Sequence, residues 1–149
     1  MISASLQKNI RTLQLEGAIS SQLEYDLKTV IDERLGEKNF GIFYGLTDKE
    51  IKKRNLLEYR RWSAEGRYRY RPPEGESYID VRARIEGFMK DKGQDWNGKN
   101  VLVITHQVPY KMFRAIIEGL DEEAVLNLPH TPNCGIQEYQ LRGGKLELS

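Results

Sequence analysis

The 149 residues of this chain are enough for one domain of ordinary size. The 23 lysines and arginines nearly balance the 22 aspartates and glutamates, and 39% of the residues are hydrophobic. This is the composition of a soluble globular protein close to neutrality, so net charge points to no particular partner.

The few cysteine and histidine residues exclude further classes of protein. The single cysteine, Cys134, forms no internal disulfide, and two histidines are too few for a Cys/His zinc cluster. No apolar stretch approaches the ~20 residues that span a bilayer, and the first residues lack the apolar core of a signal peptide. We therefore expect a cytoplasmic protein with no metal, no cofactor and no membrane partner.

The first third of the chain predicts a helix, a strand and a shaped loop. Apolar residues at near-helical spacing indicate a short amphipathic helix over residues 5–17. The β-branched run Thr29–Ile31 favours a brief strand. It leads into residues 33–47, where Gly41 and Gly45 interrupt any long element.

The middle of the chain predicts two capped helices around a loop. Thr47 can cap one basic helix that continues through residues 51–62. Residues 63–77 contain two glycines and two adjacent prolines, which favour a surface loop. Ser77 then looks like the cap of a helix that ends at about Lys92.

The last third contains the clearest strand, residues 101–105, whose continuous apolar run is typical of a strand buried on both faces. A helix over residues 106–120 follows, and Asp121 can cap a second short helix. Gly143-Gly144 lies between alternating residues and predicts a hairpin. Together the elements predict one α/β domain, residues 1–149, with a mostly parallel sheet.

His106 is the residue whose position first suggests chemistry. It follows the strand and precedes the helix, at the carboxyl end of a strand where open α/β sheets bind their ligands. The free N–H groups of Gln107 and Val108 offer an anion site there, so the expected ligand is a phosphate or a carboxylate. From position alone, a half-buried histidine that caps the helix remains an alternative.

Five segments carry a family resemblance. Residues 2–12, ISASLQKNIRT, are similar to the motif Y-S-S-x-L-x-R-A-x-x-T, with Lys8 in place of the arginine. Residues 32–47, DERLGEKNFGIFYGLT, reproduce E-R-L-x-E-x-x-F-G-x-x-x-G and are the most specific match. RPPEGESYIDVRARI, NVLVITHQVPYKMF and PNCGI follow in the family's order. From Ile2 to Leu141 the chain thus resembles the histidine phosphatase superfamily, the phosphoglycerate-mutase-like proteins.

The resemblance implies a fold and a reaction. The fold would be a three-layer α/β domain, with helices on both faces of a mostly parallel sheet. His106 would be the second pocket histidine, which stabilises the charge on a transferred phosphoryl group. Glu37 would be the proton donor, because a bound phosphate favours the protonated form of a nearby carboxyl. An exposed loop carboxylate is the alternative reading of Glu37.

The resemblance also implies a set of binding residues. Lys8 would hold phosphate with a single charge rather than with the fork of an arginine, or would simply be a solvated lysine on a helix. Ser5, Gln107 and Asn133 would complete the phosphate or substrate site. The substrate would be a small phosphate ester, handled by a phosphatase or a phosphomutase.

Arginines alternate with aromatic residues between Tyr59 and Arg71. Such interleaving can bind single-stranded nucleic acid by stacking and phosphate contacts. The rest of the chain is balanced in charge, and family members carry a variable cationic segment over the pocket mouth here. We therefore favour substrate recognition or a solvated loop over RNA.

The Arg-His-Gly motif that carries the family's nucleophilic histidine does not occur in this sequence, and His130 lies in a loop where we expect no nucleophile. We expect an N-terminally incomplete domain that lacks this strand and is inactive alone. A homodimer or a partner chain could complete the sheet, since unpaired edges favour aggregation. The alternative is a non-catalytic module that binds phosphate esters or RNA.

Overall fold

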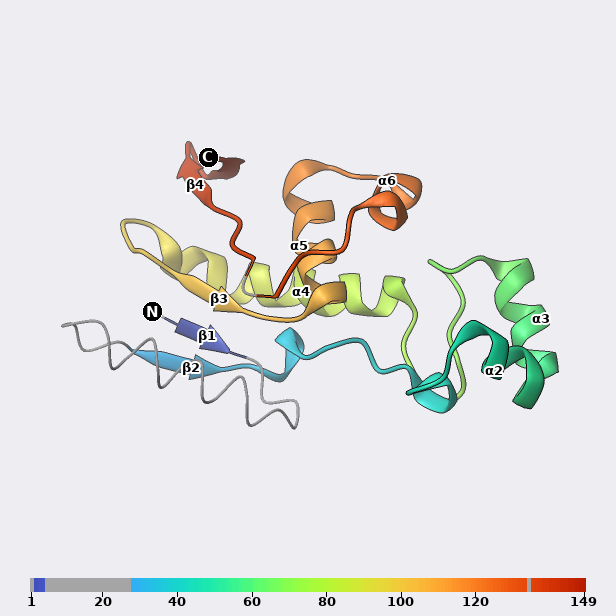
Figure 1. Ribbon diagram of the computed structural model, residues 1–149. Coiled ribbons are helices and arrows are strands. Elements are labelled where there is room, and N and C mark those ends of the chain that lie inside the picture. Colours follow the sequence, from blue (N-terminus) through green and yellow to red (C-terminus); the bar gives the residue numbers. More distant parts are fainter. Residues whose placement is uncertain (1, 5–27, 134) are drawn as a thin grey trace.

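The computed structural model describes residues 2–4, 28–133 and 135–149 (Figure 1). The helix predicted over residues 5–17 lies outside the described residues. The described helices and strands are β1 (Ile2–Ala4), β2 (Thr29–Ile31), α2 (Asp48–Arg54), α3 (Leu56–Glu65), α4 (Tyr78–Lys92), β3 (Leu102–Ile104), α5 (Gln107–Glu118), α6 (Glu122–Asn127), β4 (Tyr139–Arg142) and β5 (Lys145–Leu148), with 3-10 turns η1 (Glu33–Leu35), η2 (Gly41–Phe43) and η3 (Gly93–Trp96).

The three strands β2, β1 and β3 form a parallel sheet in that order. Ile2 lies opposite Thr29 on one side and Leu102 on the other. The strands predicted at β2 and β3 are confirmed, and each pairs in parallel with β1, a strand that was not predicted. Because β1 pairs on both sides, the gap expected inside the sheet is not seen. Among the described strands, the unpaired edges are the outer edges of β2 and β3.

The strand β3 is less buried than its apolar sequence predicts. Leu102 keeps 38% of its surface exposed, and Val103 and Ile104 are half-buried. Within the described part of the chain β3 pairs on one side only. The expectation of a strand buried on both faces was therefore wrong for the described part of the fold.

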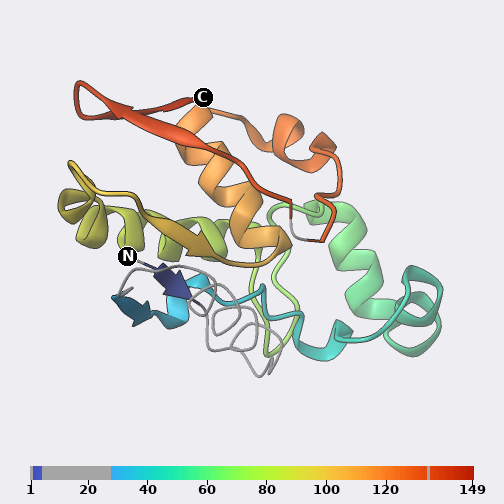
Figure 2. The ribbon, with the colours of Figure 1, turned by 60° about the vertical axis from the view of Figure 1, so that its left-hand side comes forward.

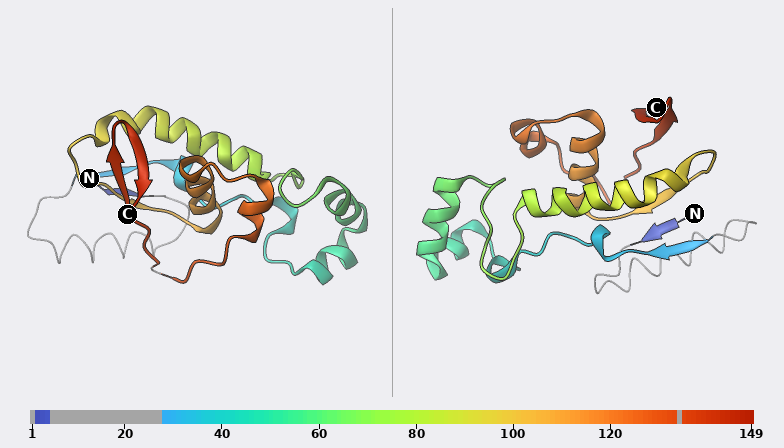
Figure 3. Two further views of the ribbon diagram at one scale, coloured as in Figure 1. Left: turned by 90° about the horizontal axis from the view of Figure 1, so that it is seen from above. Right: turned by 180° about the vertical axis from the view of Figure 1, so that it is seen from behind.

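The helix α4 covers one face of the sheet, as the right-hand view of Figure 3 shows. Ser77 caps it as predicted, because its hydroxyl accepts from the Asp80 N–H while the Asp80 carboxylate accepts from the Ser77 N–H. α5 rises from the end of β3 and packs against α4 (Figure 2). The core between them is formed by Leu35, Tyr68, Tyr78, Val81, Ile85, Phe88, Val108, Met112, Ala115 and Val125.

The helices α2 and α3 lie apart from the sheet (Figure 1). The sequence predicts one helix after Thr47, but the structure has two, since Asn55 leaves the helical conformation with φ −134° and ψ 56°. Phe43, Ile51 and Tyr70 form a separate small core beneath them. Thr47 caps α2 with a reciprocal bond to Glu50, as expected.

The segment after α3 is not the solvated loop that its prolines and glycines suggested. Tyr68 and Tyr70 are only 5% and 3% exposed. Tyr68 belongs to the core of α4 and α5, and Tyr70 stacks on Phe43 with ring centroids 5.7 Å apart. Burial removes these two rings as stacking platforms for RNA bases, whereas Tyr59 and Trp62 are half-buried.

The C-terminal third follows the predictions closely. Asp121 caps α6 by accepting from the Ala124 N–H. β4 and β5 pair antiparallel around Gly143-Gly144, both in the left-handed region. Among the helices that the structure describes, none is long and apolar enough to cross a membrane.

Candidate active site

The segment from Leu35 to Lys38 crosses from the sheet to the N-terminal end of α5. Asp32 caps the turn η1 by accepting from the Arg34 N–H at 3.0 Å, and Leu35 is fully buried in the core. The Thr105 hydroxyl, at the end of β3, donates to the Leu35 carbonyl at 2.7 Å. These contacts hold the turn that precedes Glu37 against the strand that precedes His106.

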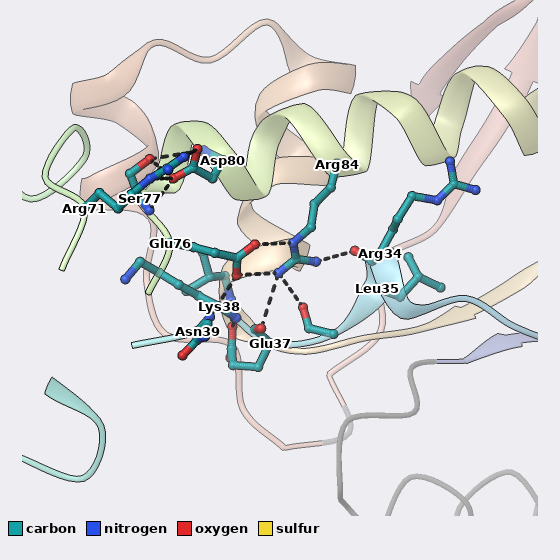
Figure 4. Close-up of polar contacts among 12 residues, drawn as sticks. Arg34, Leu35, Glu37, Lys38, Asn39, Arg71, Glu76, Ser77, Asp80 and Arg84 are labelled. Carbon is teal, nitrogen blue, oxygen red and sulfur yellow. Dashed lines mark hydrogen bonds and ion pairs between the residues drawn. The ribbon is translucent and has the colours of Figure 1, made fainter. Parts of the chain in front are cut away.

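Arg84, on α4, fixes the same segment from the other side (Figure 4). Its guanidinium donates to the carbonyl of Arg34, to that of Gly36 at 2.8 Å and to that of Glu37 at 3.3 Å. It also pairs with the Glu76 carboxylate at 2.9 Å. One rigid side chain thus satisfies three backbone acceptors at once, which fixes where Glu37 can lie.

The Glu37 carboxylate lies at the N-terminus of α5. One oxygen accepts from the Gln107 N–H at 3.1 Å, and the other accepts from the Val108 N–H at 3.2 Å and from the Lys38 N–H at 2.7 Å. The free N–H groups that the sequence predicted as an anion site therefore do bind an anion, which is a carboxylate of the chain itself. The helix dipole favours this placement.

His106 and Gln107 present buried side-chain nitrogen atoms to which no other described group forms a hydrogen bond. His106 is the N-cap residue of α5, but its side chain makes no capping bond, so the capping alternative is not supported. His106 Nε2 and Gln107 Nε2 are buried without a hydrogen-bond partner among the described residues. A buried polar atom without a partner is uncommon in proteins and marks a place where a ligand can supply the missing bond.

The structure brings together three of the six predicted site residues. Glu37, His106 and Gln107 meet at the start of α5, and the Gln107 side-chain oxygen accepts from the Thr131 N–H at 3.3 Å. Asn133 lies two residues further along, is exposed, and makes no side-chain bond to the other three within the described residues. Ser5 and Lys8 lie outside the described residues.

Sequence reasoning missed the residues that position Glu37. Glu76 and Arg84 both fall in the segment RPPEGESYIDVRARI, and their spacing across the capped start of α4 was the available signal. Lys38 was also missed, because nothing in the sequence shows that a lysine next to a loop glutamate is buried. Among the described residues, no three acidic, histidine or cysteine side chains gather where they could hold a metal ion.

Comparison with known proteins decides the family. The family model of the histidine phosphatase superfamily (branch 1) matches residues 3–149. The chain belongs to the histidine phosphatase superfamily. This confirms the resemblance that the five segments suggested.

Two curated relatives are similar to part of this chain. The bifunctional protein Rv2228c of Mycobacterium tuberculosis is 32% identical over 117 residues, which are 75% of this chain and 29% of that protein. Phosphoserine phosphatase 1 of Hydrogenobacter thermophilus is 27% identical over 97 residues, 64% of this chain and 45% of that protein. The chain therefore spans less than half the length of these relatives.

Solved structures share the fold. YhfR of Bacillus stearothermophilus superimposes with a TM-score of 0.80 at 22% identity, covering 99% of this chain and 71% of that one. A putative alpha-ribazole-5'-P phosphatase from Escherichia coli gives 0.77 at 18% identity, covering 100% and 70%. The likeness confirms the α/β histidine phosphatase fold.

Proposed function

We propose that this chain provides the acid half of a phosphoryl-transfer site for small phosphate esters. Glu37 would be the proton donor and His106 a donor to the phosphoryl group. The observation that carries the proposal is the meeting of the Glu37 carboxylate with the N–H groups of Gln107 and Val108, beside the unpartnered Nε2 of His106. Relatives named as phosphatases make a phosphate ester the natural substrate class.

His106 would act on the phosphoryl oxygens. Negative charge collects on these oxygens as the ester bond breaks. A fixed hydrogen-bond donor stabilises this transition state most strongly where the charge develops in a place shielded from water. The buried Nε2 has no competing partner among the described residues, so a phosphoryl oxygen could take its bond without displacing one. Gln107 Nε2 offers a second donor of the same kind.

Glu37 would protonate the leaving group. When the bond between phosphorus and the ester oxygen breaks, the electron pair stays on the oxygen, which takes the proton of the Glu37 carboxyl. The resulting carboxylate needs hydrogen-bond donors, and the N–H groups of Lys38, Gln107 and Val108 are the donors that bind it in the structure. The dipole of α5 favours the same product.

The nucleophile would come from outside these 149 residues. The family's phosphohistidine forms on an Arg-His-Gly histidine, and the sequence holds only His106 and His130. His130 is exposed in the loop after α6. We further propose that all 149 residues form one domain of a three-layer sheet fold, and that a further strand, from the same protein, a second copy or a partner chain, adds to an outer edge of the sheet.

Hydrolysis of p-nitrophenyl phosphate tests the assignment of roles. The 149-residue chain should turn over this ester no faster than its His106→Ala variant, because neither has a nucleophile. Orthophosphate should still bind the unaltered chain, with a dissociation constant at least about tenfold lower than for His106→Ala, the size of one charge-assisted hydrogen bond. Clear hydrolysis that depends on His106 would contradict the missing nucleophile, and equal binding would remove His106 from the site.

A further inference from the structure

Gln107 makes two different contacts at the start of α5 and has a third group free to make another. Its backbone N–H donates to the Glu37 carboxylate at 3.1 Å, and its side-chain oxygen accepts from the Thr131 N–H at 3.3 Å. Its side-chain nitrogen is buried and has no hydrogen-bond partner among the described residues. The loop after α6 therefore binds one end of the amide, and the other end is available to a ligand.

The loop after α6 is held along one side of α5. Lys111, one helical turn after Gln107, donates to the Leu128 carbonyl at 2.7 Å and to the Val125 carbonyl at 3.4 Å. Residues four apart lie on the same side of a helix, so these two side chains bind the loop at two points, Leu128 and Thr131. Val125 is fully buried in the main core, so α6 also fixes where the loop begins.

The Thr131 N–H decides which way the Gln107 amide faces. A backbone N–H can only donate, whereas a glutamine amide has an acceptor at one end and a double donor at the other. If the amide were turned over, its NH2 group would meet the Thr131 N–H, and neither donor would have an acceptor. The side-chain oxygen would then occupy the place of the nitrogen and would repel the oxygens of a bound phosphate.

We propose that the loop after α6 positions the Gln107 amide, and that the Thr131 N–H is the group that turns the NH2 of this amide toward the bound phosphate. This inference rests on the proposed function, because it adds a positioning residue to the same phosphate site. Thr131 acts through Gln107. A donor that is already aimed at a phosphoryl oxygen does not have to be ordered when the phosphate binds, so binding is tighter.

Two substitutions of Gln107 test the orientation of the amide by isothermal titration of the whole chain with orthophosphate. Gln107→Met removes both ends of the amide, so the dissociation constant should rise about tenfold, the size of one hydrogen bond to a charged group. Gln107→Glu keeps one oxygen for the Thr131 N–H but directs a second, charged oxygen at the phosphate. This variant should therefore bind at least about tenfold more weakly than Gln107→Met.

Gln94 provides the matched control for both substitutions. It is exposed in η3, at the opposite end of α4 from Glu76. Gln94→Met and Gln94→Glu make the same changes of shape and charge away from the proposed site. Both should leave the dissociation constant of orthophosphate unchanged.

Hydrogen exchange at the Thr131 amide measures the positioning contact without any ligand. In the unaltered chain and in Gln107→Glu, the Thr131 N–H has a side-chain oxygen to which it can donate. Its exchange should therefore be slower than that of the amide of His130, which is exposed in the same loop. In Gln107→Met this difference should disappear. A side chain at position 107 that only filled space would not give protection in the glutamate variant and lose it in the methionine variant.

The outcomes separate this inference from the proposed function. Equal binding of orthophosphate by the unaltered chain and both Gln107 variants would overturn the inference, and so would equal binding by the two variants. The same Thr131 exchange rate in all three proteins would overturn it as well. Failure of the unaltered chain to bind orthophosphate would overturn the phosphate pocket, and the positioning role with it. If Gln107→Glu fails to fold by circular dichroism, Gln107→Met decides: binding or Thr131 exchange like that of the unaltered chain would overturn the inference.

Discussion

The molecule has two regions that differ in how they are held together. In the main region, α4 and α5 enclose a core of ten buried residues that also reaches the turn η1 and the helix α6. In the α2–α3 region, residues 41–66, two buried side chains form the core together with Tyr70 from the following segment, and α3 itself buries none. Phe43 and Ile51 are those two. Most of the stability should therefore lie in the main region.

The proposed site lies where the chain leaves and re-enters the main region. Glu37 precedes the α2–α3 region, and Glu76 follows it. The two crossing segments are joined by the bond from the Glu76 N–H to the Asn39 carbonyl, at 2.8 Å, and by Arg84. Because Arg84 and the start of α5 bind the Glu37 segment, we expect Glu37 to be held in place by the main region.

Removing Arg84 should have the largest effect. Arg84→Met leaves Glu76 without its cation and three backbone carbonyls without their donor, so the free energy of unfolding should fall by about 3–4 kcal/mol. Arg82 lies on the same helix, and its ion pair is with the exposed Glu86. Arg82→Met should cost less than about 0.5 kcal/mol in the same urea titration. Similar losses for the two variants would show that Arg84 is not what secures the Glu37 segment.

The two isoleucines, one in each core, compare the regions directly. Ile85 is fully buried. The substitution Ile85→Ala should lower the free energy of global unfolding by about 3 kcal/mol. Ile51, 4% exposed, lies in the smaller core. Ile51→Ala should accelerate hydrogen exchange in α2 and α3 while the amides of α4 and α5 keep their protection. Uniform loss of protection in Ile51→Ala would mean that the two regions unfold as one unit.

The ion pair between Arg71 and Asp80 should make a smaller contribution to the free energy of unfolding, and this contribution should depend on pH. The Arg71 guanidinium and the Ser77 hydroxyl lower the pKa of Asp80 to about 2, below its ordinary value of about 3.9. Because the folded pKa is the lower one, the stabilisation is present above about pH 4 and is lost as the pH falls through 2. Asp80→Asn should lose about 1–2 kcal/mol at neutral pH and show a flatter dependence on acid. Parallel acid titrations of the two proteins would contradict this.

Local signals in the sequence predicted most of the elements. The capping residues Thr47, Ser77 and Asp121 each set the start of a helix, because a cap acts on backbone groups within three residues. The hairpin at Gly143-Gly144 was equally local. The break at Asn55 was missed, since neither glycine nor proline marks it.

The parts of the site that the sequence did not show depend on distant contacts. Tyr68 and Tyr70 are buried because α4 and Phe43 pack over them, which no pattern near residue 70 encodes. Arg84 contacts carbonyls about fifty positions away along the chain. The burial of Lys38 likewise depends on residues that are distant from it in the sequence. His106 was found from its position at the end of a strand and Glu37 from a family motif, and their meeting at the start of α5 required the structure.

The imidazole signals of the two histidines in a proton–nitrogen NMR spectrum test the central claim most directly. His106 is proposed to bind phosphate through its buried Nε2, and His130, exposed in a loop, serves as an internal control. Titration of the unaltered chain with orthophosphate should shift the His106 signals in a saturable manner and leave those of His130 in place. An unshifted His106, or equal shifts of both histidines, would contradict the phosphate pocket.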